Sequence, residues 1–174
     1  MYCTKLKNKF PILGYQQFEE VLSYQDIITY SNVFVPNTFE LFSIIPKQYR
    51  DKFSLSLMKV SGQVPPHVDS GSKSVVNFYI KTDNCTTQFY KKDPSAVVFE
   101  FSGHGQEKGA LYDVTKLEAT ESFVAVPTEA WLLNVNEPHA VWNNEEKINR
   151  VAISLSTDIP YVDVKKMLEE TRNL

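Results

Sequence analysis

The stretch Ser-Val-Val-Asn-Phe-Tyr-Ile-Lys at residues 74–81 indicates the fold class most clearly. Side chains alternate across a β-strand, so Val76 and Phe78 share an apolar face, whereas Asn77 and Tyr79 share a face that carries polar groups. The apolar face predicts a strand packed on a core. The polar face either lines a cavity or meets water, and the pattern alone leaves both interpretations open.

Comparable short runs follow one another over residues 53–157, separated by turn-forming residues such as the Asp-Asn pair at 83–84. Many short strands at this spacing are typical of a sandwich, barrel or jelly roll. We therefore expect a mainly β protein. The further predicted strands cover residues 53–60, 86–90, 96–101, 110–114, 121–126, 130–135, 139–142 and 150–156.

The two ends of the chain have a different pattern. Apolar residues between 18 and 28 fit one or two amphipathic helices, Pro46 can open a short helical turn, and residues 162–168 predict a closing helix. No repeat or linker interrupts the chain. The expected organisation is one domain over residues 1–174, with a helical N-terminal cover at 1–52, a β core at 53–157 and a C-terminal helix within 158–174.

Composition narrows the possible partners. The chain has 18 Lys and Arg against 21 Asp and Glu, a net charge of −3. This balance disfavours a nucleic acid or an anionic membrane held mainly by charge. No apolar segment approaches the roughly 20 residues of a membrane span, and Cys3 and Cys85 are too few for a disulfide framework. We expect a soluble, cytoplasmic protein without a membrane partner.

Two of the three histidines lie in a pattern that suits a metal ion. His67 and Asp69 are two residues apart, so in an extended segment both side chains project to the same side. His139 begins a later predicted strand. Two imidazoles and one carboxylate without thiolates match the facial triad of non-haem Fe(II) oxygenases, which leaves metal positions open for other ligands. A single histidine beside a strand is more often structural, and the ordered set favours the metal interpretation.

Arg150 begins the last predicted strand, and no acidic residue shares its strand face. A guanidinium at the mouth of a cavity of apolar and small residues needs an anionic partner, because an unpaired buried charge costs several kcal/mol. A dicarboxylate ligand can supply that charge through a bidentate contact. A salt bridge to a carboxylate elsewhere in the fold is the alternative.

The ordered set of His67, Asp69, His139 and Arg150 resembles the Fe(II)/2-oxoglutarate-dependent oxygenases, whose fold is a double-stranded β-helix, a cupin-like jelly roll. The run His-Ala-Val-Trp-Asn at residues 139–143, followed by Arg150, is similar to the aspartyl/asparaginyl β-hydroxylase branch. The likeness covers roughly residues 53–157. Better-known members of that branch lack the carboxylate ligand, whereas Asp69 occupies the usual superfamily position here.

The resemblance implies a dioxygenase that converts 2-oxoglutarate to succinate and CO2 and hydroxylates a C–H bond of a small molecule or peptide side chain. It implies Fe(II) held by His67, Asp69 and His139. Arg150 would bind the distal carboxylate of 2-oxoglutarate. Asn77 and Tyr79, on the polar face of their strand, are candidates for further hydrogen bonds to that cosubstrate.

Two other functions fit the same residues. One is a cupin-type metal-dependent oxygenase or isomerase that does not use 2-oxoglutarate, and the other is a non-catalytic jelly-roll binding module with structural histidines. The third histidine, His104, lies in a predicted loop, with substrate contact at the cavity rim as its alternative role. Residues 143–147 predict a solvated hairpin. The substrate and the oligomeric state are not readable from the residues.

Overall fold

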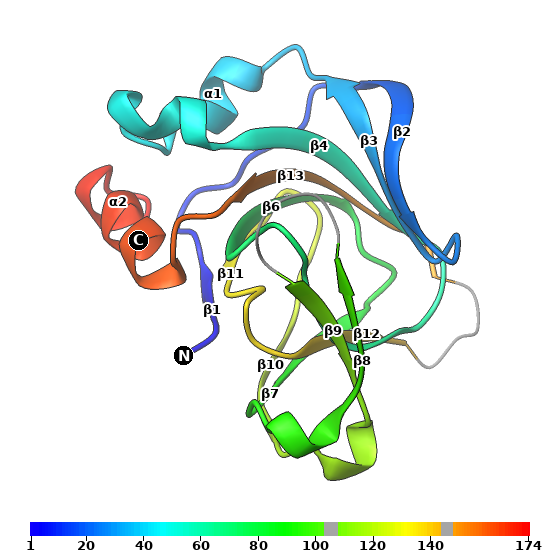
Figure 1. Cartoon of the computed structure of the whole chain (residues 1–174). Helices are drawn as coiled ribbons and strands as arrows, with labels where there is room; N and C mark the ends of the chain where they lie inside the picture. The colour runs from blue at the N-terminus through cyan, green and yellow to red at the C-terminus, as the bar shows by residue number, and fades with distance from the viewer. Residues whose placement is uncertain (103–107, 144–147) are drawn as a thin grey trace.

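The protein is built on two antiparallel β-sheets in the computed structural model (Figure 1). The structure describes residues 1–102, 108–143 and 148–174. The expectation of a mainly β chain is confirmed. Two α-helices accompany the sheets, α1 (Thr38–Ser43) and α2 (Tyr161–Glu170), together with the 3-10 turns η1 (Lys47–Lys52), η2 (Pro94–Ala96) and η3 (Val114–Lys116).

The strands within each sheet do not follow chain order. The larger sheet has seven strands in the order β1 (Cys3–Lys5), β11 (Ala130–Leu133), β6 (Ser74–Lys81), β13 (Arg150–Thr157), β4 (Ser54–Val60), β3 (Ile28–Phe34) and β2 (Gln16–Tyr24). The smaller sheet has six strands in the order β10 (Ala119–Val124), β7 (Thr86–Tyr90), β12 (His139–Trp142), β5 (Val64–Val68), β9 (Lys108–Tyr112) and β8 (Val97–Ser102).

The two faces of β6 enter different hydrophobic clusters, as the alternation of its residues predicts. Val76 and Phe78 belong to a cluster that also contains Leu41 of α1 and Leu168 of α2, so the helices cover this face. Tyr79 belongs to a second cluster that joins residues of both sheets. Strand β6 therefore separates a core under the helices from a space between the sheets, and that space holds the polar side chains.

Strand β13 presents its polar face to the same space. It pairs with β6 so that Ser154 lies opposite Asn77, and the Ser154 hydroxyl donates to Asn77 Oδ1 at 2.6 Å. Arg150 lies on the same face of β13 and donates to the Tyr79 hydroxyl. Of the two interpretations of the polar faces, an interior lined with polar groups is correct for these four residues, all of which are buried.

The predicted helical cover over residues 1–52 is wrong for its main part. Residues 18–28 are not helical: they fall in β2 and β3, which extend the larger sheet beside β4. A tight turn joins these strands, with positive φ at Gln25 (49°) and Asp26 (56°) and a hydrogen bond from the Ile27 amide to the Tyr24 carbonyl. Two successive positive φ values are characteristic of a type I′ hairpin turn. An Asn-Gly pair predicts such a turn from sequence, whereas the Gln-Asp pair found here does not.

The other element predictions hold with small shifts at their ends. The strands predicted at 74–81, 86–90 and 139–142 have those bounds, and the C-terminal helix spans Tyr161–Glu170. Pro46 precedes the 3-10 turn η1, as expected. Strand β5 was not among the predicted strands: it contains Pro65 and Pro66, and its pairing with β12 is irregular.

Two predictions lie outside the described residues. His104 falls in the segment 103–107, and most of the hairpin predicted at 143–147 falls in the segment 144–147. Over the part of the chain that the structure describes, no helix combines the length and the apolar character that crossing a bilayer requires.

Candidate metal centre

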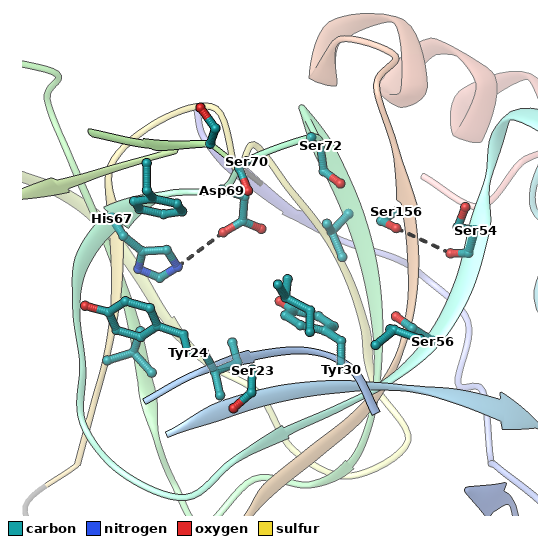
Figure 2. Close-up of a pocket in the computed structure, with 18 of the residues that line it drawn as sticks. Ser23, Tyr24, Tyr30, Ser54, Ser56, His67, Asp69, Ser70, Ser72 and Ser156 are labelled. Atoms are coloured by element: carbon teal, nitrogen blue, oxygen red, sulfur yellow. Dashed lines mark hydrogen bonds and ion pairs between the residues drawn. The ribbon is translucent and has the colours of Figure 1, made fainter. Parts of the chain in front are cut away.

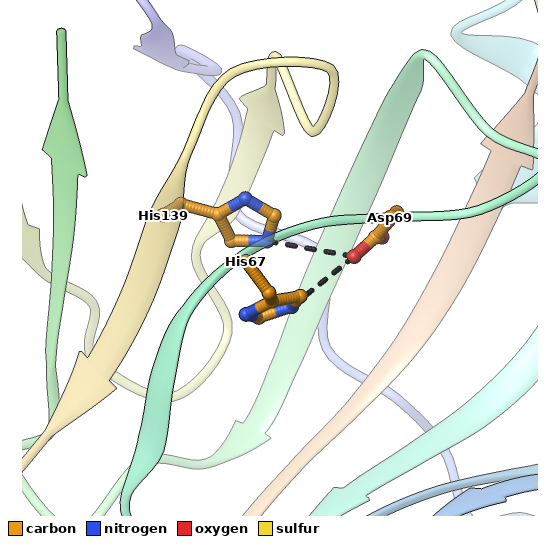
Figure 3. A group of neighbouring side chains, drawn as sticks. All are labelled: His67, Asp69 and His139. Atoms are coloured by element: carbon orange, nitrogen blue, oxygen red, sulfur yellow. Dashed lines mark ion pairs between the residues drawn. The ribbon is translucent and has the colours of Figure 1, made fainter. Parts of the chain in front are cut away.

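Strand pairing brings the two predicted histidine ligands together (Figure 3). His67 lies near the end of β5, and His139 is the first residue of β12, its antiparallel neighbour. The two are register partners, with ring centroids 4.3 Å apart. Asp69 follows two residues after His67, and its backbone amide donates to the Val135 carbonyl at 3.1 Å, which fixes the chain where β5 ends.

The three side chains converge on a small volume. His67 Nε2 lies 3.2 Å from Asp69 Oδ1, and His139 Nε2 lies 3.7 Å from the same oxygen. One ligand atom from each residue can be chosen so that all three lie within 4.8 Å of one another. The prediction that these residues meet in one group is confirmed, and the described residues contain no other such group.

Each imidazole is held by a backbone carbonyl two residues upstream. His67 Nδ1 lies 2.9 Å from the Pro65 carbonyl, and His139 Nδ1 lies 3.0 Å from the Glu137 carbonyl. A carbonyl oxygen can only accept, so both contacts require a proton on Nδ1 and leave Nε2 directed toward Asp69. Metal-binding histidines are oriented in this way by a partner on the second ring nitrogen.

Burial and mutual charge set the protonation of the group. Burial lowers the pKa of His139 to about 4, and the neighbouring His67 charge acts in the same direction. Burial by itself would lower the pKa of His67, but the hydrogen bond and the charge of Asp69 outweigh it and raise that pKa. The same contacts, opposing burial, lower the pKa of Asp69. A carboxylate with two imidazoles, one of them neutral, is ready to exchange a proton for a metal ion.

A cavity of about 480 Å³ opens beside the group (Figure 2). His67 and Asp69 line it, together with Tyr30 from β3, Leu55 from β4 and Val75 from β6. Its volume falls within the roughly 300–1,000 Å³ of small-molecule sites. The metal group therefore faces a space large enough for a ligand.

Arg150 is buried, with 2% of its surface exposed, so the expected position at a cavity mouth is wrong. Its Nη2 donates to the Tyr79 hydroxyl at 2.5 Å, and its guanidinium carbon lies 4.7 Å from the centre of the Tyr79 ring. Nε and Nη1 have no hydrogen-bond partner, and no carboxylate among the described residues pairs with the guanidinium. The salt-bridge alternative therefore has no partner among residues 1–102, 108–143 and 148–174.

Leaving the Nε and Nη1 donors of Arg150 unpaired in the interior lowers the stability of the folded protein. An anion that accepts hydrogen bonds from these donors removes this loss of stability. The positive charge of Arg150 contributes to the lowered pKa of His139. Arg150 is not among the described residues that line the cavity, and neither are Asn77 and Tyr79. Asn77 is engaged with Ser154, and Tyr79 is engaged with Arg150.

Sequence reasoning missed Tyr30, which lines the cavity from β3. Burial and the negative charge of Asp69 hold the pKa of Tyr30 well above its ordinary value, although Arg150 opposes this. Its hydroxyl therefore stays protonated and available as a donor. The sequence feature that could have located Tyr30 is the β-branched and aromatic content of residues 27–35. Such content favours a β-strand, whereas we predicted a helical cover over residues 1–52.

The donor set suits a divalent first-row metal. Two imidazole nitrogens and one carboxylate oxygen are ligands for Fe(II), and also for manganese, nickel and zinc. The fixed Nε2 atoms and the adjacent cavity fit a metal that keeps positions open. A scan against protein-family models found no match for this chain, and a search among curated proteins found none. What the site does is therefore inferred from its own chemistry.

Proposed function

We propose that the protein is an Fe(II)- and 2-oxoglutarate-dependent dioxygenase with a double-stranded β-helix core. The observation that carries the proposal is the convergence of His67, Asp69 and His139 beside a cavity, with both imidazoles oriented by backbone carbonyls. Two facing antiparallel sheets are the architecture that a jelly roll requires.

The second support is Arg150. Its guanidinium keeps two nitrogens without a hydrogen-bond partner in the interior, and the carboxylate of a ligand can accept from this group. The Tyr79 hydroxyl accepts from Nη2 and so orients the guanidinium. A five-carbon dicarboxylate can place one end on the metal group and the other on this arginine, provided that the closed interior opens for it.

Each residue has a defined part in this reaction. His67, Asp69 and His139 would hold the ion, and His67 and Asp69 also line the cavity where a ligand would lie. Tyr30 keeps its proton and can donate to an anionic ligand beside Asp69. When bound, Fe(II) supplies the oxidising chemistry: 2-oxoglutarate and O2 react with a substrate R–H to give R–OH, succinate and CO2.

A metal-dependent enzyme that does not use 2-oxoglutarate is the second candidate. The observation that favours it is that Arg150 lies off the cavity wall and is tied to Tyr79. The two candidates share the metal group and differ in the role of Arg150. Anaerobic titration separates them, because 2-oxoglutarate chelating Fe(II) produces a weak visible charge-transfer band.

The titration uses anaerobic Fe(II)-loaded protein and follows visible absorbance as 2-oxoglutarate is added. We expect a saturable band in the unsubstituted protein. In Arg150→Met we expect the concentration at half saturation to rise at least 10-fold, because two charge-assisted hydrogen bonds are lost. Arg50→Met, at a partly buried arginine outside the metal group and the cavity lining, serves as the control. Loading with Fe(II) but no band with 2-oxoglutarate would support the second candidate.

A further inference from the structure

The cavity beside the metal group has two chemically different ends. Strand β4 (Ser54–Val60) contributes its first three residues, Ser54, Leu55 and Ser56, to the lining. At the first end, Ser54 is the register partner of Ser156 on β13. At the second end, Ile28 of β3 lines the cavity, and Ile28 is the register partner of Val60 on β4. Figure 2 shows Asp69 facing the space between these ends.

The first end is lined by serine hydroxyls. Ser54, Ser56 and Ser156 come from the neighbouring strands β4 and β13, and Ser72 comes from the segment that leads into β6. The residue after Ser72 donates its amide to the Thr157 carbonyl at 2.9 Å, which holds this segment against the end of β13. Among the described residues, no partner holds the hydroxyls of Ser54, Ser56 and Ser72. They are available to a ligand as donors and acceptors.

The second end is mostly aromatic and aliphatic, although Ser23 and Ser102, the chain neighbours of Tyr24 and Phe101, also line the cavity. Tyr24 at the end of β2 stacks with Phe101 of β8, with ring centroids 6.4 Å apart. These rings connect the two sheets across the cavity, and Leu22 and Leu111 extend the apolar lining. Leu22 is partly exposed, which places it where the cavity meets solvent. This end offers dispersion contacts and hydrophobic burial.

The lining carries little charge. Of the described residues that line the cavity, only His67 and Asp69 have an acidic or basic side chain, apart from two tyrosines. Both belong to the metal group, where a bound divalent ion would offset the carboxylate. Away from that group, an ionised phosphate, carboxylate or ammonium of a ligand finds hydroxyl groups among the described residues but no side chain of opposite charge, so its charge stays uncompensated.

We infer that this cavity binds an uncharged small molecule that has hydroxyl or amide groups at one end and a hydrocarbon group at the other. Hydroxyls of the ligand pair with the serines, and the hydrocarbon lies against Tyr24 and Phe101. The middle of such a molecule lies beside Asp69. The claim that this molecule is the oxidised substrate rests on the proposed function. The claim that the cavity binds such a molecule does not.

Three matched probes test the inference by calorimetric titration of the full chain. Hexyl β-D-glucoside has both ends, hexyl β-D-glucuronide adds one carboxylate, and methyl β-D-glucoside lacks the hydrocarbon. We expect saturable one-site binding of hexyl glucoside. The other two probes should bind at least about 10-fold more weakly, because one places an unpaired charge in the cavity and the other leaves the aromatic end unfilled.

Variants locate the binding. Replacing both Ser54 and Ser56 by alanine should weaken hexyl glucoside about 3- to 10-fold, because hydrogen bonds to the ligand are lost. Leu22→Asp should weaken it comparably by placing charge at the apolar end. Ser95→Ala, in the exposed 3-10 turn η2, is the matched control and should change nothing. Thermal melting verifies that each variant is folded.

Each titration is run without metal and with excess Ni(II), so that two failures can be told apart. Absence of Ni(II) binding counts against the proposed function. A preference for hexyl glucoside over hexyl glucuronide, both without metal and with Ni(II), supports the inference whether or not the proposed function is correct. The inference is overturned if hexyl glucoside does not bind saturably or if the glucuronide binds equally well. The inference is also overturned if the affinity for hexyl glucoside is unchanged in the Ser54 and Ser56 double variant and in Leu22→Asp.

Discussion

His67 and His139 lie opposite each other on adjacent antiparallel strands, and each imidazole points its Nε2 at the same oxygen of Asp69. The carbonyl two residues before each histidine accepts from Nδ1. A local contact, repeated in two strands, thus orients both imidazoles as a metal site requires.

The first prediction concerns these tautomers. In the metal-free protein at pH 6, His139 should be neutral with its proton on Nδ1, because its pKa is lowered to about 4. Nitrogen-15 NMR of the ring nitrogens measures this directly. On addition of Zn(II), both histidines should show a protonated Nδ1 and a metal-shifted Nε2. A proton on Nε2 of His139 in the metal-free protein would show that the Glu137 carbonyl does not orient the ring.

The second prediction concerns metal affinity. Asp69→Asn keeps the side-chain shape and removes the ligand charge, so Co(II) or Fe(II) affinity should fall by at least about 100-fold, more than the loss of an outer hydrogen bond causes. Asp163→Asn, an exposed carboxylate in α2, should leave affinity unchanged. Anaerobic calorimetry measures both. Equal affinities in the two variants would place the ion elsewhere.

The third prediction separates the function of Arg150 from stability. Its guanidinium is buried with two unpartnered nitrogens, so Arg150→Met should leave the free energy of unfolding unchanged or raise it by up to about 2 kcal/mol. Arg50 instead donates from Nε to the Ile45 carbonyl at 2.9 Å. Arg50→Met should lower the free energy of unfolding by about 1 kcal/mol.

Urea denaturation measures both arginine variants. A loss of more than about 2 kcal/mol in Arg150→Met would mean that the folded protein already satisfies this charge. In that case an anionic ligand would not be needed to stabilise it.

The fourth prediction concerns acid stability. Burial by itself would raise the pKa of Glu129, but hydrogen bonds from Lys5, the Trp131 indole and the Val126 amide outweigh it and lower that pKa to about 2. A lowered pKa contributes stability that is present above the ordinary value of 4.5 and is lost as pH falls through about 2.

The variant Glu129→Gln should therefore lower the free energy of unfolding by about 1–3 kcal/mol at pH 7, and the difference should shrink between pH 4.5 and 2. Glu118→Gln, at an exposed ion pair with Lys91, should have little effect at any pH. Denaturant unfolding at several pH values measures this. A constant difference between Glu129→Gln and the unsubstituted protein across that range would contradict the assigned role.

The sequence predicted what local geometry determines. His67 and Asp69 share a side because they are two residues apart in extended chain, and the face of Asn77 and Tyr79 follows from alternation. The hairpin of β2 and β3 was missed because Gln25 and Asp26 adopt positive φ without the usual glycine or asparagine. Tyr30 therefore had no predicted place beside the metal group.

The burial of Arg150 also lay beyond sequence reasoning. Its face on β13 was predictable, but its pairing with Tyr79 depends on the register between β13 and β6, which short-range patterns do not specify.

The most direct test of the central claim follows the C1 carboxylate of 2-oxoglutarate. Fe(II)-loaded protein in air, given 2-oxoglutarate labelled with carbon-14 at C1, should release labelled CO2 together with one succinate per CO2. His67→Ala should abolish this release, and Ser95→Ala should not change it. Equal release by His67→Ala, or none from unsubstituted protein that has bound Fe(II), would contradict the account.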